Sequence, residues 1–214
     1  MADRTYRWLL VTLAVIGLSA DQASKYGVFK WLYRGGELSG GIGNESDVVP
    51  GWFKLIAQFD HETPVCDCGF SGLQTWSTNG APVMPRVNHG ALFGLGQGQK
   101  GNANGFFAVV SLAAAIAIVI WGTRRHTARE RGLMAALGLI LGGTVGNLYD
   151  RIVFGGVRDF LYFYKVEWPV FNVADCCLVV GAALLLIQAV FVSPAPEAPV
   201  VSEGEAVVPE EPKV

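Results

Sequence analysis

Two aspartates are the residues of this sequence best suited to acid–base chemistry. The only histidines are His61, His89 and His126, and no Ser/His/Asp or Cys/His arrangement of nucleophile and base is present. Asp159 and Asp175 bracket a segment of 15 residues, which is long enough to turn the chain and bring the two carboxyl groups together. Two adjacent carboxyls cannot both ionise, so one keeps a proton while the other acts as a base. The pair therefore predicts an aspartic protease dyad that activates a water molecule.

Further polar residues lie beside apolar segments and are expected at the same end of the molecule. Asp21 and Lys25 are four residues apart, on one helical face, where they can neutralise each other. The other members of this group are Asp150, Arg151, Arg158 and Asn172. Ionisable groups at membrane depth are costly, so the group indicates a functional site inside a helical bundle. Each residue taken alone is equally compatible with an interfacial anchor or a helix cap.

The elements that would position these residues are apolar helices. Of the 214 residues, 51% are hydrophobic and 16% are charged, which argues against an ordinary soluble fold. Charged side chains are absent from 101–123, 132–149 and 176–196, and each segment is near the roughly 20 residues that a spanning helix needs. We predict an all-α membrane protein with four spanning helices and a small extracytoplasmic cap that contains β-strands. The helices are expected at about 6–32, 103–123, 132–149 and 174–193.

The first apolar segment has two interpretations. It ends in Leu-Ser-Ala before Asp21, as a cleavable secretory signal would. Apolar residues resume after Lys25, however, which favours an uncleaved first helix.

The distribution of charge predicts the topology. Arg4, Arg7 and the arginine-rich link 124–131 are expected in the cytoplasm, because short basic segments stay inside. Both termini are then cytoplasmic, and 33–102 and 150–173 lie outside. The membrane domain is expected to cover 1–192. The tail 193–214 holds five Glu, five Pro and one Lys and is expected to be a disordered acidic extension, and neither part resembles a nucleic-acid binder.

Five ordered motifs extend across about 155 residues. They are DQASK at 21–25, NHGALF at 88–93, GGTVGNLYDR at 142–151, GVRDF at 156–160 and FNVAD at 171–175. Together they resemble the lipoprotein signal peptidase family, also called signal peptidase II. Members are bacterial membrane aspartic peptidases that cut signal peptides from lipid-modified prolipoproteins.

The resemblance implies a role for each matching residue. Asp159 and Asp175 would be the catalytic pair. The residues that would position the peptide and brace the aspartates are Asp21, Lys25, Asn88, Gly90, Asn147, Asp150, Arg151 and Asn172. The family needs no metal and no cofactor. Its site is at the extracytoplasmic face of the bacterial cytoplasmic (inner) membrane, where the partners are membrane lipids and diacylglyceryl-modified prolipoproteins, cut before the lipidated cysteine. Sensitivity to globomycin and function as a monomer are also expected.

Two features depart from the family pattern. Arg158 stands where a small apolar residue usually precedes the first catalytic aspartate, and we expect it to face lipid headgroups. The cap, at about 34–100, contains an insertion at about 60–86. Its residues His61, Cys66 and Cys68 allow a zinc clip or redox pairing of the cysteines, but a polar surface hairpin is favoured, because the spacing is short for zinc and strained for a disulfide.

Two other classes of protein remain alternatives. A transporter could use these buried ionisable groups to carry protons or an ion, and a scaffold could use them to lock helices together. A transporter would place polar groups near the middle of the bilayer, whereas these are expected at one face.

Overall fold

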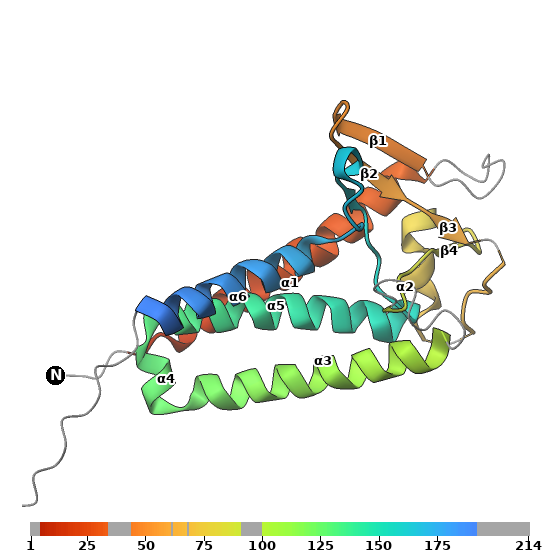
Figure 1. Cartoon of the computed structure of the whole chain (residues 1–214). Helices are drawn as coiled ribbons and strands as arrows, with labels where there is room; N and C mark the ends of the chain where they lie inside the picture. The colour runs from red at the N-terminus through yellow and green to blue at the C-terminus, as the bar shows by residue number, and fades with distance from the viewer. Residues whose placement is uncertain (1–4, 34–43, 61, 68, 91–99, 192–214) are drawn as a thin grey trace, which may run out of the picture.

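Long helices lie side by side, and short strands gather beyond one end of them (Figure 1). The computed structural model describes residues 5–33, 44–60, 62–67, 69–90 and 100–191. The long helices are α1 (Arg7–Leu32), α3 (Lys100–Thr123), α5 (Arg131–Phe154) and α6 (Val173–Phe191). The short helix α4 (Arg125–Arg129) joins α3 to α5 at the end opposite the strands. The expected tail 193–214 lies outside the described residues.

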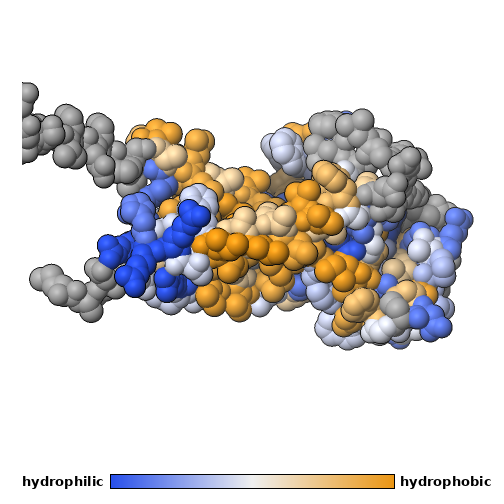
Figure 2. Space-filling view, turned by 90° about the horizontal axis from the view of Figure 1, so that it is seen from below, coloured by the Kyte–Doolittle hydropathy of each residue, from blue (hydrophilic) through white to orange (hydrophobic). Residues whose placement is uncertain are grey.

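The surface has an apolar band between two hydrophilic ends (Figure 2). Among the described residues, three helices are long and apolar enough to cross a membrane: Ala103–Thr123, Arg131–Phe154 and Val173–Phe191. These correspond to the last three expected spans. The first expected span is the continuous helix α1, which is 26 residues long but is not among these three.

Helix α5 is longer than expected and carries two of the polar residues. It continues past 149 to Phe154 and ends at Gly155, whose φ of 73° is the left-handed conformation common after helices. Asp150 and Arg151 therefore lie within the helix rather than after it. No glycine or proline lies between Gly146 and Gly155, and the charge of Asp150 is compensated inside the protein.

Helix α5 is central to the bundle and contacts α1, α3 and α6. Its glycines allow backbones to approach closely, as small residues do between membrane helices. A methyl group at Gly142 would lie 2.8 Å from the backbone oxygen of Ala14 in α1. One at Gly143 would collide with the backbone oxygen of Ala174 in α6. Gly143 thus fixes the position along α5 at which the first turn of α6 packs.

The described segments 44–60, 62–67, 69–90 and 155–172, which are called the cap here as a structural label, contain two small antiparallel sheets. The first has the order β1 (Asn44–Val49), β2 (Phe53–Ala57), β5 (Leu161–Tyr162), and the second pairs β3 (Phe59–Asp60) with β4 (Met84–Pro85). β5 comes from the segment after α5, so the cap is tied to the bundle from both sides. A buried apolar cluster that includes Phe29, Phe59 and Phe160 joins the C-terminal end of α1 to both sheets.

The expected insertion at about 60–86 is closed by the β3–β4 pair, as in a hairpin, but its interior is partly helical. It contains α2 (Ser71–Thr75) and the 3₁₀ turn η1 (Trp76–Thr78). The Gln74 side chain is buried and donates to the Val153 carbonyl of α5 at 2.7 Å, so the insertion is attached to the bundle. The preference against redox pairing of the cysteines is wrong, because Cys66 is disulfide-bonded and its sulfur is therefore not a free thiolate for zinc. His61 and Cys68 lie outside the described residues.

Replacement of Gly143 by alanine is expected to lower the stability of the protein by about 1–3 kcal/mol, because the added methyl group overpacks the α5–α6 contact. The matched control is Gly27→Ala in α1, where an added methyl group meets no atom within 4 Å. Alanine is the better helix former, so this control should keep or raise the midpoint of thermal unfolding in detergent. Equal midpoints for the two variants would contradict the close contact at Gly143.

Candidate active site

The two aspartates singled out in the sequence meet through one asparagine. Asp159 follows α5 in an irregular segment, and Asp175 lies in the first turn of α6. Asn172 is fully buried and binds both: its Nδ2 donates to Asp159 Oδ1 at 2.7 Å, and its backbone N–H donates to Asp175 Oδ2 at 3.2 Å. The fold thus holds the two carboxyl groups around a shared neighbour.

Asp175 is fixed by a reciprocal cap at the start of α6. The Asp175 backbone N–H donates to Asn172 Oδ1 at 3.0 Å, while the Asp175 carboxylate accepts the Asn172 N–H. This is the capping-box arrangement, with Asn172 in the N-cap position and Asp175 three residues later. The same motif that begins the helix therefore orients the carboxylate.

Asp159 is held from the cap side by Asn88. Asn88 Nδ2 donates to Asp159 Oδ2 at 3.0 Å, and Asn88 Oδ1 accepts the Gly90 N–H at 2.9 Å. The backbones of Asn88 and Val157 exchange hydrogen bonds of 2.7 and 2.8 Å, which fixes the two segments together. Gly90 has a φ of 103°, which an L side chain rarely adopts, and a Cβ there would collide with the ring of Phe107.

Asn147 of α5 connects Asp175 to the charged residues of α1. Its Nδ2 donates to Asp175 Oδ1 at 2.9 Å, and its Oδ1 accepts from Lys25 Nζ at 3.2 Å. Asn172 Nδ2 also approaches that oxygen, at 3.3 Å. One asparagine amide thereby joins three helical segments behind the pair of aspartates.

Four side chains with no solvent exposure form a compensated cluster beside Asn147. They are Asp21, Lys25, Asp150 and Arg158. Lys25 Nζ lies 2.8 Å from Asp21 Oδ2 and 3.3 Å from Asp150 Oδ2. Asp21 Oδ1 accepts the backbone N–H of Ala174 at 2.9 Å, so the cluster also holds the first turn of α6. Two positive and two negative groups balance, as buried charges require.

The expectation that Arg158 faces lipid headgroups is wrong. Its Nη2 lies 2.8 Å from Asp150 Oδ1, and its Nε and backbone N–H both donate to Asp150 Oδ2, at 3.2 and 2.9 Å. The guanidinium is 4.1 Å from the ring centre of Tyr26 and 3.9 Å from that of Phe154. Ion pairing and aromatic contact together make the buried position favourable.

Gln22 completes the cluster and was missed in the sequence. Its Nε2 donates to Asp21 Oδ2 and Asp150 Oδ1, and its Oε1 accepts from Arg158 Nη2, over distances of 2.9 to 3.2 Å. The only signal was its place inside the DQASK motif, next to Asp21.

Arg151 is the site residue with the most unused hydrogen-bonding capacity. Its Nη1 is 3.5 Å from Asn104 Oδ1 on α3, and its guanidinium lies 5.0 Å from the ring centre of Phe107. Its Nε is buried and has no hydrogen-bond partner among the described residues. The charge of Arg151 acts on both Asp159 and Asp175. Asn104 and Phe107 carried no signal in the sequence, because α3 resembled an ordinary apolar span.

The environment of Asp159 favours a protonated carboxyl. Burial and the nearby charge of Asp175 raise the pKa of Asp159 to about 7, against the opposing effect of the Asn88 and Asn172 amides. A carboxyl that keeps its proton near neutral pH can act as a general acid.

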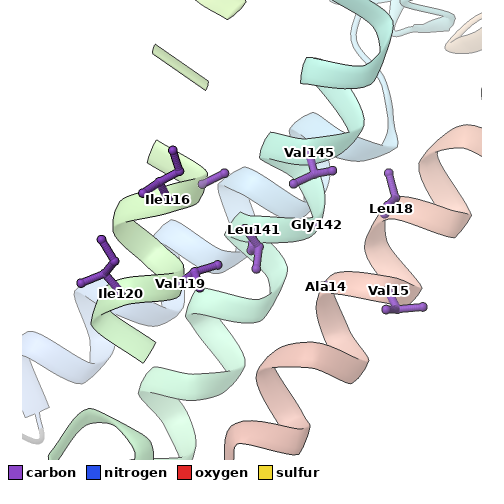
Figure 3. A pocket seen from close by; sticks show the side chains of 10 residues that line it. Ala14, Val15, Leu18, Ile116, Val119, Ile120, Leu141, Gly142 and Val145 are labelled. Atoms are coloured by element: carbon purple, nitrogen blue, oxygen red, sulfur yellow. The ribbon is translucent and has the colours of Figure 1, made fainter. Parts of the chain in front are cut away.

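Two cavities flank this group of residues. An apolar cavity of about 430 Å³ lies between α1, α3 and α5, and Figure 3 shows aliphatic side chains from these helices around it. Its lining on α5 includes Val145, which is within two helical turns of Asn147 and Arg151. A second cavity, of about 310 Å³, is bordered by Asp159 and by residues of the cap.

Replacement of Asp150 by asparagine is expected to destabilise the protein by about 3–5 kcal/mol, because it leaves Lys25 and Arg158 buried with too little negative charge. The control is Glu45→Gln, which removes the surface partner of Lys54 and should cost less than about 1 kcal/mol. Adding Arg158→Met to Asp150→Asn should restore part of the loss in thermal unfolding. A double variant no more stable than Asp150→Asn would argue against charge balance as the cause.

The chain is similar to known signal peptidases. The family model for signal peptidase (SPase) II matches residues 71–191. The lipoprotein signal peptidase of Rhodopirellula baltica is 34% identical over 194 residues, covering 84% of this chain and 70% of that protein. That of Symbiobacterium thermophilum is 33% identical over 186 residues, covering 86% and 95%.

Two solved structures described as bacterial membrane enzymes have a similar fold. Their TM-scores are 0.62 and 0.59, each at 21% identity, and they cover 88% and 89% of this chain and 92% and 98% of theirs. The fold, the matched region and the two relatives agree with the resemblance carried by the five motifs. The chain belongs to the signal peptidase II family, a family of membrane proteases.

Proposed function

We propose that this protein is an aspartic endopeptidase that removes signal peptides from diacylglyceryl-modified prolipoproteins, cutting before the lipidated cysteine. The observation that carries the proposal is the pair Asp159 and Asp175, joined through Asn172 at the strand-bearing end of the bundle. Family membership supports the substrate class, and the dyad supports the chemistry.

The two aspartates take different roles in this mechanism. Asp175 lies in the first turn of α6, where the helix dipole favours a negative charge, and its oxygens accept N–H groups of Asn147 and Asn172. It is assigned as the base that takes a proton from water as the water oxygen attacks the scissile carbonyl carbon. Asp159 is assigned as the acid whose proton is given to the carbonyl oxygen. Asp175 then returns its proton to the leaving nitrogen as the C–N bond breaks, and Asp159 takes a proton back from the intermediate's hydroxyl group as the C=O bond re-forms.

Arg151 is assigned to hold the peptide. Its guanidinium has unused donors in a planar fork, which suits a backbone carbonyl of the substrate. Asn88, Asn147 and Asn172 then keep the aspartates in position, and Asp21, Lys25 and Asp150 brace the three helical segments behind them. Gly90 provides the turn that lets Asn88 reach Asp159.

The apolar cavity between α1, α3 and α5 is assigned to the apolar segment of the signal peptide. Its lining is aliphatic (Figure 3). On α5, Val145 of this lining is within two helical turns of Asn147 and Arg151. A peptide held there would reach the dyad from the membrane.

The membrane topology follows from the same assignment. Helix α1 is proposed as a fourth span, since it lies beside α5 and exposes Trp8, Val11, Val15 and Ile16. The arginine-rich segment around α4 would stay in the cytoplasm, together with both termini, which puts the aspartates at the extracytoplasmic face of the inner membrane. A single chain holds every assigned group, so a monomer suffices.

Asp159→Asn and Asp175→Asn are each expected to lower cleavage of a diacylglyceryl prolipoprotein in membranes by at least about a hundredfold, because each removes a proton-transfer group. The control, Asp47→Asn, changes an exposed aspartate of β1 and should cleave normally. Thermal unfolding of all three variants checks folding. Full activity in either dyad variant would exclude the mechanism.

The rate should also report the proton on Asp159. Its pKa is raised from the usual 3.8 to about 7, so the carboxyl is mostly protonated below that pH and ionised above it. We expect kcat/KM to fall by about tenfold per pH unit above about pH 7, since the ionised acid cannot donate.

The Asn88 amide lowers the pKa of Asp159, so Asn88→Ala should move this fall to higher pH even though the rate itself is reduced. A pH profile that stays flat from pH 7 to 9, or a shift to lower pH in the variant, would contradict the assignment of Asp159 as the acid.

A further inference from the structure

The cavity of about 310 Å³ beside Asp159 lies on the cap side of the proposed dyad. Its lining comes from β2, the segment 86–88, Asp159 and the loop before α6, and includes Gln58, Arg86 and Val170. None of its lining residues belongs to α1, α3, α5 or α6. The apolar cavity is lined by different elements, since all of its lining residues belong to α1, α3 and α5. The dyad therefore has an apolar approach on the bundle side and a partly polar one on the cap side.

The segment that carries Arg86 is rigid. The Arg86 backbone N–H donates to the Gln58 carbonyl at 2.8 Å, and Asn88 exchanges two backbone hydrogen bonds with Val157. Val87 packs against the buried cluster of Tyr26, Met84, Val153 and Phe154. Arg86, Val87 and Asn88 all line the cavity, so this hydrogen-bonded segment forms one of its walls.

Arg86 is the cationic residue in the lining of this cavity. Its side chain is exposed, and no hydrogen bond is found between its guanidinium and another described residue. The charge of Asp60 is close enough to interact with Arg86, but the Asp60 carboxylate accepts hydrogen bonds from Glu62 and Thr63 instead. The guanidinium therefore keeps free donors at the mouth of a cavity that also contains the proposed acid.

The chemistry of the substrate assigns the two cavities to opposite sides of the scissile bond. The apolar signal peptide precedes the bond, whereas the residues after the lipidated cysteine belong to the mature lipoprotein and leave toward water. We propose, on the basis of the proposed function, that the cap-side cavity binds the first residues after the lipidated cysteine and that Arg86 favours an acidic side chain there. The insertion at about 60–86 thereby gains a role, since β3 and β4 close it immediately before Arg86.

The test uses the full-length enzyme in membranes and three diacylglyceryl prolipoproteins that differ only in the residue after the cysteine: Asp, Ser or Lys. The wild-type enzyme should cleave the Asp substrate with a kcat/KM about two- to fivefold above that of the Lys substrate, the range given by exposed ion pairs. Arg86→Gln should remove the difference and Arg86→Glu should reverse it. The difference should also shrink at high salt.

Lys54→Gln is the matched control, because Lys54 is a cap lysine on β2 that pairs with Glu45 and does not line the cavity. It should keep the wild-type preference. Two outcomes overturn the role of Arg86 and leave the proposed function standing. In the first, every variant cleaves the Ser substrate but the wild-type enzyme shows no charge preference. In the second, the charge preference survives Arg86→Gln. Failure of the wild-type enzyme to cleave any of the three substrates overturns the proposed function and this inference with it.

Discussion

The balance of buried charge is the constraint on which the rest of the structure depends. Asp21, Lys25, Asp150 and Arg158 have no contact with solvent, and removing one of them would leave a buried charge without compensation. That cost is a large fraction of the total stability of a typical domain. The cluster therefore fixes how α1, α5 and the segment before Asp159 meet. Through Ala174 and Asn147 it also fixes the first turn of α6.

The two aspartates depend on this frame in different ways. Asp175 is part of the N-terminal capping box of α6, and α6 packs closely against α5 at Gly143. Asp175 therefore moves only together with that helix. Asp159 lies in irregular backbone, although its neighbours Arg158 and Phe160 are both held by hydrogen bonds. Adjustment to a substrate is thus expected from the cap and the Asn88 segment rather than from the bundle.

Much of this arrangement could be predicted from sequence, for identifiable reasons. Uninterrupted apolar segments gave the positions of α3, α5 and α6, and five motifs gave the family. The end of α5 was misjudged because the charge of Asp150 resembles the start of a loop until its partner is known. Arg158 was misplaced for the same reason. Alternation along extended backbone predicts the side on which its side chain lies, but it does not reveal that Asp150, eight residues earlier, is buried on that side as its ion-pair partner. The helical turns in the insertion and the contacts of Arg151 with α3 depend on tertiary packing, which leaves no local pattern.

The pairing within the buried cluster has a consequence for how the chain enters a bilayer. Asp21 and Lys25 are one helical turn apart on α1, and Asp150 of α5 is eight residues before Arg158, which lies in the irregular segment after that helix. These four charges can therefore enter the bilayer as two neutral pairs. Insertion of the two segments and their later docking then become separable steps for this cluster.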